Sequence, residues 1–78
     1  MEIEQAFGIV IKKHRLERSM SQENLAFEAG LDRTFISLLE RGKRRPTVNT
    51  LFLISRVFEI KPHEIVKEVE NLLYKHKN

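Results

Sequence analysis

The chain has 78 residues, no cysteine and a formal net charge of +3. A chain of this length forms one small domain that buries roughly 60% of its unfolded surface, which leaves no room for a separate effector-binding or catalytic domain. No apolar run approaches the roughly 18 residues that a membrane span requires, and no signal peptide is visible. Together with the lack of cysteine, these features favour a cytoplasmic protein without disulfides.

The charge is distributed unevenly along the chain. Residues 1–30 carry four Lys or Arg against five Glu, residues 31–58 carry six against two acids, and residues 59–78 carry four against four. The positive excess therefore lies in the middle segment. A local basic stripe is the electrostatic signature of a protein that binds a polyanion such as duplex DNA.

The first expected helix spans residues 3–18. Apolar residues recur at helical spacing, and Phe7 and Ile11 form an i, i+4 pair on the side that faces the core. The cationic side chains that we expect to face water are Lys12, Lys13 and Arg18.

The middle of the chain predicts a helix, a tight turn and a second helix. Ser21 is a candidate N-cap for a helix over residues 22–29, which Gly30 ends because glycine adopts the left-handed conformation at low cost. Asp32 is a candidate N-cap for the next helix, over residues 33–41. Two short helices joined by such a turn form a helix-turn-helix, the unit that places its second helix in the major groove of DNA.

A projection of residues 33–41 at about 100° per residue separates two faces of this helix. The first face, about 140° wide, carries Arg33, Thr34, Ser37, Leu38 and Arg41. The opposite face carries Ile36, Leu39 and Glu40, with Phe35 near the boundary. Any amphipathic surface helix has two such faces. A long cationic side chain at the start of the helix, with small hydroxyls behind it, favours base reading, because the N-terminal turn of a recognition helix reaches base edges. The base-reading residues assigned on this helix are Arg33, Thr34, Ser37 and Leu38.

A basic loop over residues 41–49 follows, and four of its first five residues are cationic. We assign Arg41, Lys43 and Arg45 to phosphate contacts beside the groove. One arginine of the loop, assigned as Arg44, reaches a base or enters a minor groove. The alternative is an ordinary solvated loop.

Two further helices are expected, over residues 48–58 and 62–74. Thr47 is a good N-cap for the fourth helix, and Pro62 suits the first position of the fifth. The last residues, from Lys75 to Asn78, are expected to fray.

The fifth helix carries more apolar side chains than one small core can cover. Ile65 and Val69 are expected to serve the core of the domain. The surplus residues either cap the first helix or form a dimer face. The residues assigned to a dimer interface are Phe52, Val69, Leu72 and Leu73.

The segments SQENLA, AGLDRTFIS and LLERGKRRPT resemble the Cro/CI-type (XRE) helix-turn-helix family of phage repressors and bacterial regulators. The resemblance covers about residues 7–66. The residues at the expected spacing are Gln22, Leu25, Ala26, Gly30, Ile36, Ser37, Glu40 and Gly42. It implies an all-α, five-helix, lambda-repressor-like domain that binds double-stranded DNA as a homodimer. Within the family, LDRTFIS followed by a basic loop is similar to the controller proteins of restriction–modification systems.

The resemblance also implies roles for four residues. Arg15 pairs with Glu40 in a partly buried ion pair that ties the first helix to the third; the alternative is two solvated charges worth under ~1 kcal/mol. Gln22, at a helix N-terminus, contacts a phosphate and supports the recognition helix. Glu23 contacts the sigma subunit of RNA polymerase, although a surface glutamate near a helix N-terminus needs no such partner.

The chain lacks the parts of an enzyme. His14, His63 and His76 show no metal-ligand spacing, and there is no glycine-rich phosphate loop. We expect no cofactor or metal, and we predict a nucleoid-associated transcription regulator that binds a near-palindromic operator and responds to its own concentration. One alternative is an antitoxin or phage-type repressor whose main partner is another protein. Another is an interaction module that has lost DNA binding.

Overall fold

The computed structural model describes residues 1–75, a range that holds five α-helices and no strand. The helices are α1 (Ile3–Glu17), α2 (Gln22–Ala29), α3 (Arg33–Glu40), α4 (Val48–Phe58) and α5 (Pro62–Lys75). The expected ranges differ from these by one residue at the ends of α1, α3 and α5 and agree elsewhere. Lys75, which we expected to fray, belongs to α5, whereas residues 76–78 lie outside the described part of the chain. The all-α, five-helix fold class is confirmed.

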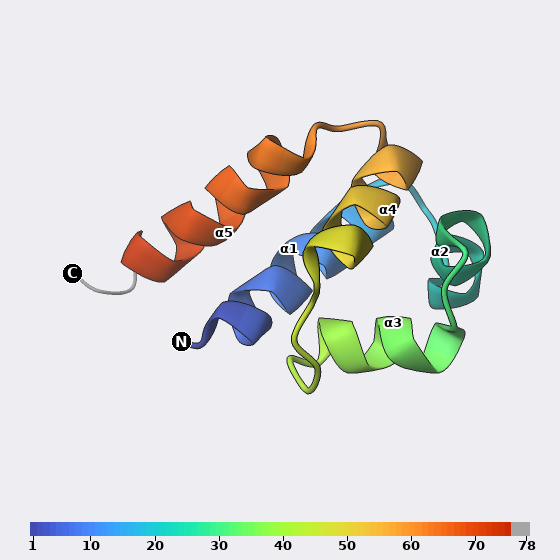
Figure 1. Cartoon of the computed structure of the whole chain (residues 1–78), viewed down its shortest axis with the longest axis horizontal. Helices are drawn as coiled ribbons and strands as arrows, with labels where there is room; N and C mark the ends of the chain where they lie inside the picture. Colours follow the sequence, from blue (N-terminus) through green and yellow to red (C-terminus); the bar gives the residue numbers. More distant parts are fainter. Residues whose placement is uncertain (76–78) are drawn as a thin grey trace.

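Helix α1 runs through the middle of the molecule, with α3 packed on one side and α5 on the other (Figure 1). Helix α2 contacts α3 and α4 and completes the helix-turn-helix. All five helices contribute to the core, whose buried apolar side chains are Ala6, Phe7, Val10, Ile11, Leu25, Ala26, Ala29, Ile36, Leu39, Ile54, Phe58, Ile65 and Val69.

Val69 requires a correction, because the sequence assigned it to a dimer interface. Its side chain is only 8% exposed and belongs to the core of its own chain. Helix α5 packs against α1 and α4, which turns Ile65 and Val69 inward together. Leu72 and Leu73 are half-buried and pack against the same core.

The predicted helix caps are largely present. The Ser21 hydroxyl accepts a hydrogen bond from the Asn24 amide at 3.0 Å, and the Thr47 hydroxyl accepts one from the Thr50 amide at 3.1 Å. Gly30 adopts the left-handed conformation, with φ of 70°, at the end of α2. Asp32 has the extended backbone of an N-cap, but its carboxylate caps no amide of α3, so this part of the expectation is wrong.

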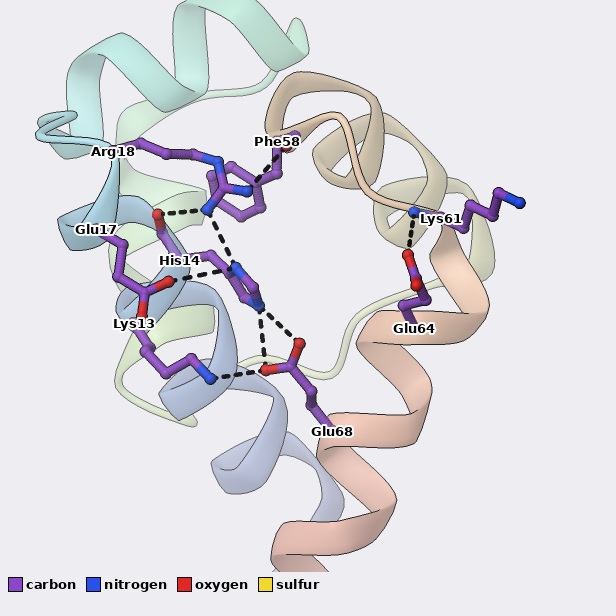
Figure 2. A network of polar contacts seen from close by, with 8 residues as sticks. All are labelled: Lys13, His14, Glu17, Arg18, Phe58, Lys61, Glu64 and Glu68. Atoms are coloured by element: carbon purple, nitrogen blue, oxygen red, sulfur yellow. Dashed lines mark hydrogen bonds and ion pairs between the residues drawn. The ribbon is translucent and has the colours of Figure 1, made fainter.

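Glu68 on α5 is the centre of a polar network that joins α5 to α1 (Figure 2). Its carboxylate accepts hydrogen bonds from Lys13 Nζ at 2.9 Å and from His14 Nε2 at 2.9 Å. Burial alone would raise the pKa of Glu68, but the hydrogen bonds from Lys13 and His14 outweigh it and lower the pKa. The same contact with Glu68 raises the pKa of Lys13. The ionised carboxylate therefore stabilises the position of α5.

Arg18 extends this network to α4. Its guanidinium donates hydrogen bonds to the His14 and Phe58 carbonyl oxygens at 3.0 Å each and lies 4.9 Å from the Phe58 ring centroid. Figure 2 shows the His14 ring between Arg18 and Glu68. His14 Nδ1 lies 3.1 Å from Arg18 Nη1 and 3.8 Å from Glu17 Oε1, while His14 Nε2 faces Glu68. Lys12 and Lys13 are exposed as expected, although Lys13 also pairs with Glu68, whereas Arg18 is half-buried, so the expectation that it faces water is wrong.

We predict that Glu68→Gln lowers the free energy of unfolding at pH 7 by about 1 kcal/mol, because charge-assisted hydrogen bonds are lost. The folded-state pKa of Glu68 lies below its ordinary value of 4.5. The difference should therefore be complete above that value and disappear as the pH falls through the folded-state pKa. Urea denaturation across this pH range measures it. The exposed Glu70→Gln is the control and should stay within ~0.5 kcal/mol of wild type. A Glu68→Gln difference that does not change with pH would contradict the role of the charge.

Candidate nucleic-acid interface

Helix α3 has one buried face and one exposed face, as the projection predicts. Ile36 and Leu39 are completely buried, and Glu40 is almost so. The side chains on the other face are exposed for Arg33, Thr34 and Arg41 and half-buried for Ser37 and Leu38. An eight-residue helix is not stable alone in water, so packing of its apolar face holds the exposed face in place.

The predicted Arg15–Glu40 ion pair is present and buried. Arg15 Nε donates to Glu40 Oε2 at 2.7 Å and Arg15 Nη2 donates to Glu40 Oε1 at 3.0 Å, while Nη1 donates to the Met20 carbonyl oxygen at 2.8 Å. The hydrogen bond to Glu40 raises the pKa of Arg15. One guanidinium thus connects α1, the α1–α2 loop and the end of α3.

Gln22 joins the same cluster from the start of α2. Its Nε2 donates to Glu40 Oε1 at 3.0 Å, so the side chain supports the recognition helix, as the resemblance implies. The side-chain amide is therefore engaged inside the protein. The contribution of Gln22 to phosphate binding remains a prediction.

Gly8 permits the close approach of α1 to the end of α3. A Cβ atom at this position would lie 2.8 Å from the Glu40 carbonyl oxygen and closer still to that of Leu39. Sequence reasoning did not single out Gly8. A glycine inside an otherwise helical apolar pattern was the available signal, because such a glycine usually marks a close packing contact.

The basic loop leaves α3 in a defined direction. Gly42 has φ of 71°, and the Lys43 amide donates to the Leu38 carbonyl oxygen at 2.9 Å, which closes the last turn. The loop then passes beside the start of α1 before α4 begins (Figure 1). Arg45 Nε lies 3.5 Å from Glu4 Oε2 on α1, although the Arg45 side chain is 86% exposed.

Arg44 has a different partner within this loop. Its guanidinium carbon lies 5.8 Å from the centroid of the Phe35 ring on α3. Phe35 itself is half-buried and packs against the core. The structure thus brings Arg44 beside α3, and Lys43, Arg44 and Arg45 all have exposed side chains.

The apolar residues assigned to a dimer interface do not form one cluster. Phe52 on α4 is 57% exposed and lines a groove of about 680 Å³ between the end of α4 and the start of α5. Leu72 instead lines a hollow between α1 and α5, together with Ile9 and Val10. The most exposed large apolar side chain, Phe27 on α2 at 85%, was missed by sequence reasoning.

Within residues 1–75, no group of three His, Asp or Glu side chains lies close enough to hold a metal ion. His76 falls outside this range. No helix in the described part of the chain is long and apolar enough to cross a membrane.

The helix-turn-helix family model matches residues 11–65. The control protein C.BamHI of Bacillus amyloliquefaciens is 41% identical over 61 residues, which cover 77% of this chain and 75% of that protein. The chain belongs to the helix-turn-helix family and to its controller proteins. It is a DNA-binding transcription regulator.

Solved controller proteins share the fold. The structure of the restriction–modification controller protein C.AhdI from Aeromonas hydrophila has a TM-score of 0.77 at 32% identity and covers 80% of this chain and 94% of that one. The C.Esp1396I tetramer in complex with its 35-base-pair operator has a TM-score of 0.76 at 40% identity and covers 88% and 96%. In this controller protein, α2 and α3 are therefore the helix-turn-helix, and α3 is the recognition helix.

We predict that Glu40→Leu lowers the free energy of unfolding by about 3–5 kcal/mol, because the Arg15 charge stays buried without its partner. The double variant Arg15→Leu with Glu40→Leu should be more stable than Glu40→Leu alone, since neither buried charge remains. Urea denaturation of wild type, Arg15→Leu, Glu40→Leu and the double variant gives the coupling, and Glu28→Leu controls for loss of an exposed carboxylate. Simple addition of the two single effects would mean that the charges act independently.

Proposed function

We propose that two copies of this controller protein bind a near-palindromic operator, each with α3 in the major groove. The observation that carries this proposal is the exposed face of α3, which starts with Arg33 and continues directly into the basic loop. The relative C.Esp1396I has been seen bound to a 25-base-pair operator. A two-fold dimer presents its two recognition helices about one turn of DNA apart, which matches a palindromic site.

The proposed contacts divide into base reading and positioning. Arg33 binds guanine through its two-pronged guanidinium, the commonest specific contact in the major groove. The side chains that read bases beside it are Thr34, Ser37, Leu38 and Arg44, with Leu38 against a thymine methyl group. Those that bind phosphates are Arg41, Lys43 and Arg45. Gln22 binds a phosphate through the free backbone N–H groups at the start of α2, since its side chain holds Glu40.

We predict that Arg33→Ala and Lys43→Ala affect DNA binding in different ways. Arg33→Ala should relax the sequence preference at one position of each half-site, because a good arginine–guanine pair is worth roughly 1–3 kcal/mol. Lys43→Ala should weaken binding to all duplexes alike and reduce the salt dependence by about one counterion per subunit. Selection of bound duplexes from a random pool at fixed salt, followed by titration of the recovered site, measures both effects.

The wild-type outcome of this selection tests the proposed function itself. A recovered palindrome with half-sites about one turn apart supports it and fixes the subunit spacing. Recovery of no motif, with binding that disappears as salt rises, would mean that the basic stripe binds polyanions without sequence preference, and would contradict the proposed function. An unchanged preferred sequence for Arg33→Ala would refute the base-reading assignment of that residue alone.

We place the centre of the dimer interface at Phe52. Its exposed ring borders the groove between α4 and α5, which also contains Leu53, Ile60 and Pro62. Two copies related by a two-fold axis would each insert an aromatic side chain into the groove of the other, and this self-complementary arrangement is the one that such symmetry requires. Leu72 and Leu73 contribute what remains exposed of their half-buried side chains, and Val69 is excluded by its burial.

We predict that Phe52→Asp raises the dimer dissociation constant at least tenfold, because an aromatic anchor is lost and a charge enters the interface. Sedimentation equilibrium over a range of concentrations measures this change. Phe27→Asp is the matched control, since Phe27 is exposed on α2, away from the groove, and it should leave dimerisation unchanged. Equal effects of the two substitutions would place the interface elsewhere.

The regulatory input is the concentration of the protein. A regulator that dimerises weakly occupies its operator steeply as its own level rises. This behaviour suits an autoregulatory restriction–modification controller acting on the nucleoid in the cytoplasm. For activation, we propose that the exposed Glu23 on α2 contacts the sigma subunit of RNA polymerase. Loss of activation with intact operator binding in Glu23→Ala would support that contact.

A further inference from the structure

We propose that Phe35 is a positioning residue for DNA recognition, because its ring holds the Arg44 guanidinium beside the base-reading face of α3. The proposal deepens the function proposed above and rests on the role given there to Arg44. It gives Phe35, a half-buried residue of α3, a role in operator recognition.

The backbone gives Arg44 little freedom to lie elsewhere. The Lys43 amide is fixed to the Leu38 carbonyl oxygen at 2.9 Å, and Thr47 already caps α4. Only residues 44–46 span these two fixed points, and Pro46 restricts its own φ. The start of the Arg44 side chain is therefore set by the end of α3 and the start of α4.

The Phe35 ring is a rigid platform for the other end of this side chain. It is half-buried, packs against the core, and lies at the boundary between the two faces of α3. The distance of 5.8 Å from its centroid to the Arg44 guanidinium carbon lies within the roughly 6 Å range of cation–π attraction. An unrestrained arginine side chain loses rotamer freedom when it binds DNA, which costs entropy. Because the contact with Phe35 already restricts Arg44 in the free protein, less entropy is lost on binding.

A contact with the ring face also leaves the N–H groups of Arg44 available. The five donors of a guanidinium lie in its plane, whereas a cation–π partner engages its flat face or its charge. Arg45 offers a contrast within the same loop, because its Nε faces the Glu4 carboxylate at 3.5 Å, a pairing that a phosphate must displace. In residues 1–75, Phe35 is the one partner found for the Arg44 guanidinium. The loop thus holds Arg44 in place while its guanidinium N–H groups remain available to bind DNA.

The test is a double-mutant cycle on operator affinity, measured by fluorescence anisotropy with the selected duplex. Phe35→Leu keeps an apolar side chain against the core and removes the aromatic face. We expect it to weaken binding about 2- to 5-fold for each subunit on the operator, the range for one exposed cation–π contact. In an Arg44→Ala background the same substitution should have no further effect, whereas in a Lys43→Ala background its full effect should remain. Phe35→Tyr should bind like wild type.

A change in sequence preference separates positioning from a purely structural role. Duplexes selected with Phe35→Leu should lose preference at the base pair affected by Arg44→Ala and keep it at the base pair affected by Arg33→Ala. Equal losses of affinity in the Arg44→Ala and Lys43→Ala backgrounds would overturn the proposal. If wild type recovers a palindrome but the cycle shows no coupling, this inference alone fails. If wild type recovers no motif, the proposed function and this inference fail together.

A second measurement uses the wild-type protein alone and therefore does not depend on whether a variant folds. In the free wild-type protein, the ring current of Phe35 should shift the NMR resonances of the Arg44 Cδ protons upfield relative to those of the exposed Arg41. Equal shifts for the two arginines would place Arg44 away from the ring and would overturn the proposal.

Discussion

The buried ion pair between Arg15 and Glu40 is the interaction on which the placement of the recognition helix depends. Glu40 lies in the last turn of α3, where a negative charge is unfavourable to the helix dipole. Hydrogen bonds from Arg15 on α1 and from Gln22 on α2 offset this cost. A helix of eight residues thereby acquires a fixed orientation from two neighbours, which its own backbone hydrogen bonds cannot supply. The exposed face with Arg33 is presented in one direction because the opposite face is held at this point.

Several features of the structure follow from local chemistry and were predictable. Ser21, Gly30 and Thr47 each stabilise a helix end through contacts within a few residues, so the helix ranges could be placed within one residue. The division of α3 into two faces follows from helical periodicity alone. The Arg15–Glu40 pair, by contrast, came from the family resemblance, since no local spacing joins residues on α1 and α3.

The contacts that sequence reasoning missed join side chains far apart in the chain. Nothing near Arg18 indicates that the last carbonyl of α4 lies within its reach, and nothing near His14 indicates Glu68. The contact of Arg44 with Phe35 likewise depends on how the loop folds back after Gly42. Val69 was assigned both to the core and to a dimer interface, because the apolar stripe of α5 does not show how much of that helix its own domain covers. In the structure α5 packs against α1 and α4, and this packing buries Val69 in the core.

The pairing of charges explains how a modest net charge of +3 serves a DNA-binding protein. On α1, Lys13 and Arg15 are matched by Glu68 and Glu40, so their charges hold helices together and contribute little to the external field. Within residues 1–75, the salt bridges found leave Arg33, Arg41, Lys43 and Arg44 without a carboxylate partner. All four lie on α3 or directly after it. Acidic residues thus pair with cations of α1 that hold helices together, whereas of the five cations on α3 and in the loop after it, Arg45 alone faces a carboxylate in these salt bridges. The position of the charge therefore matters more here than its sum.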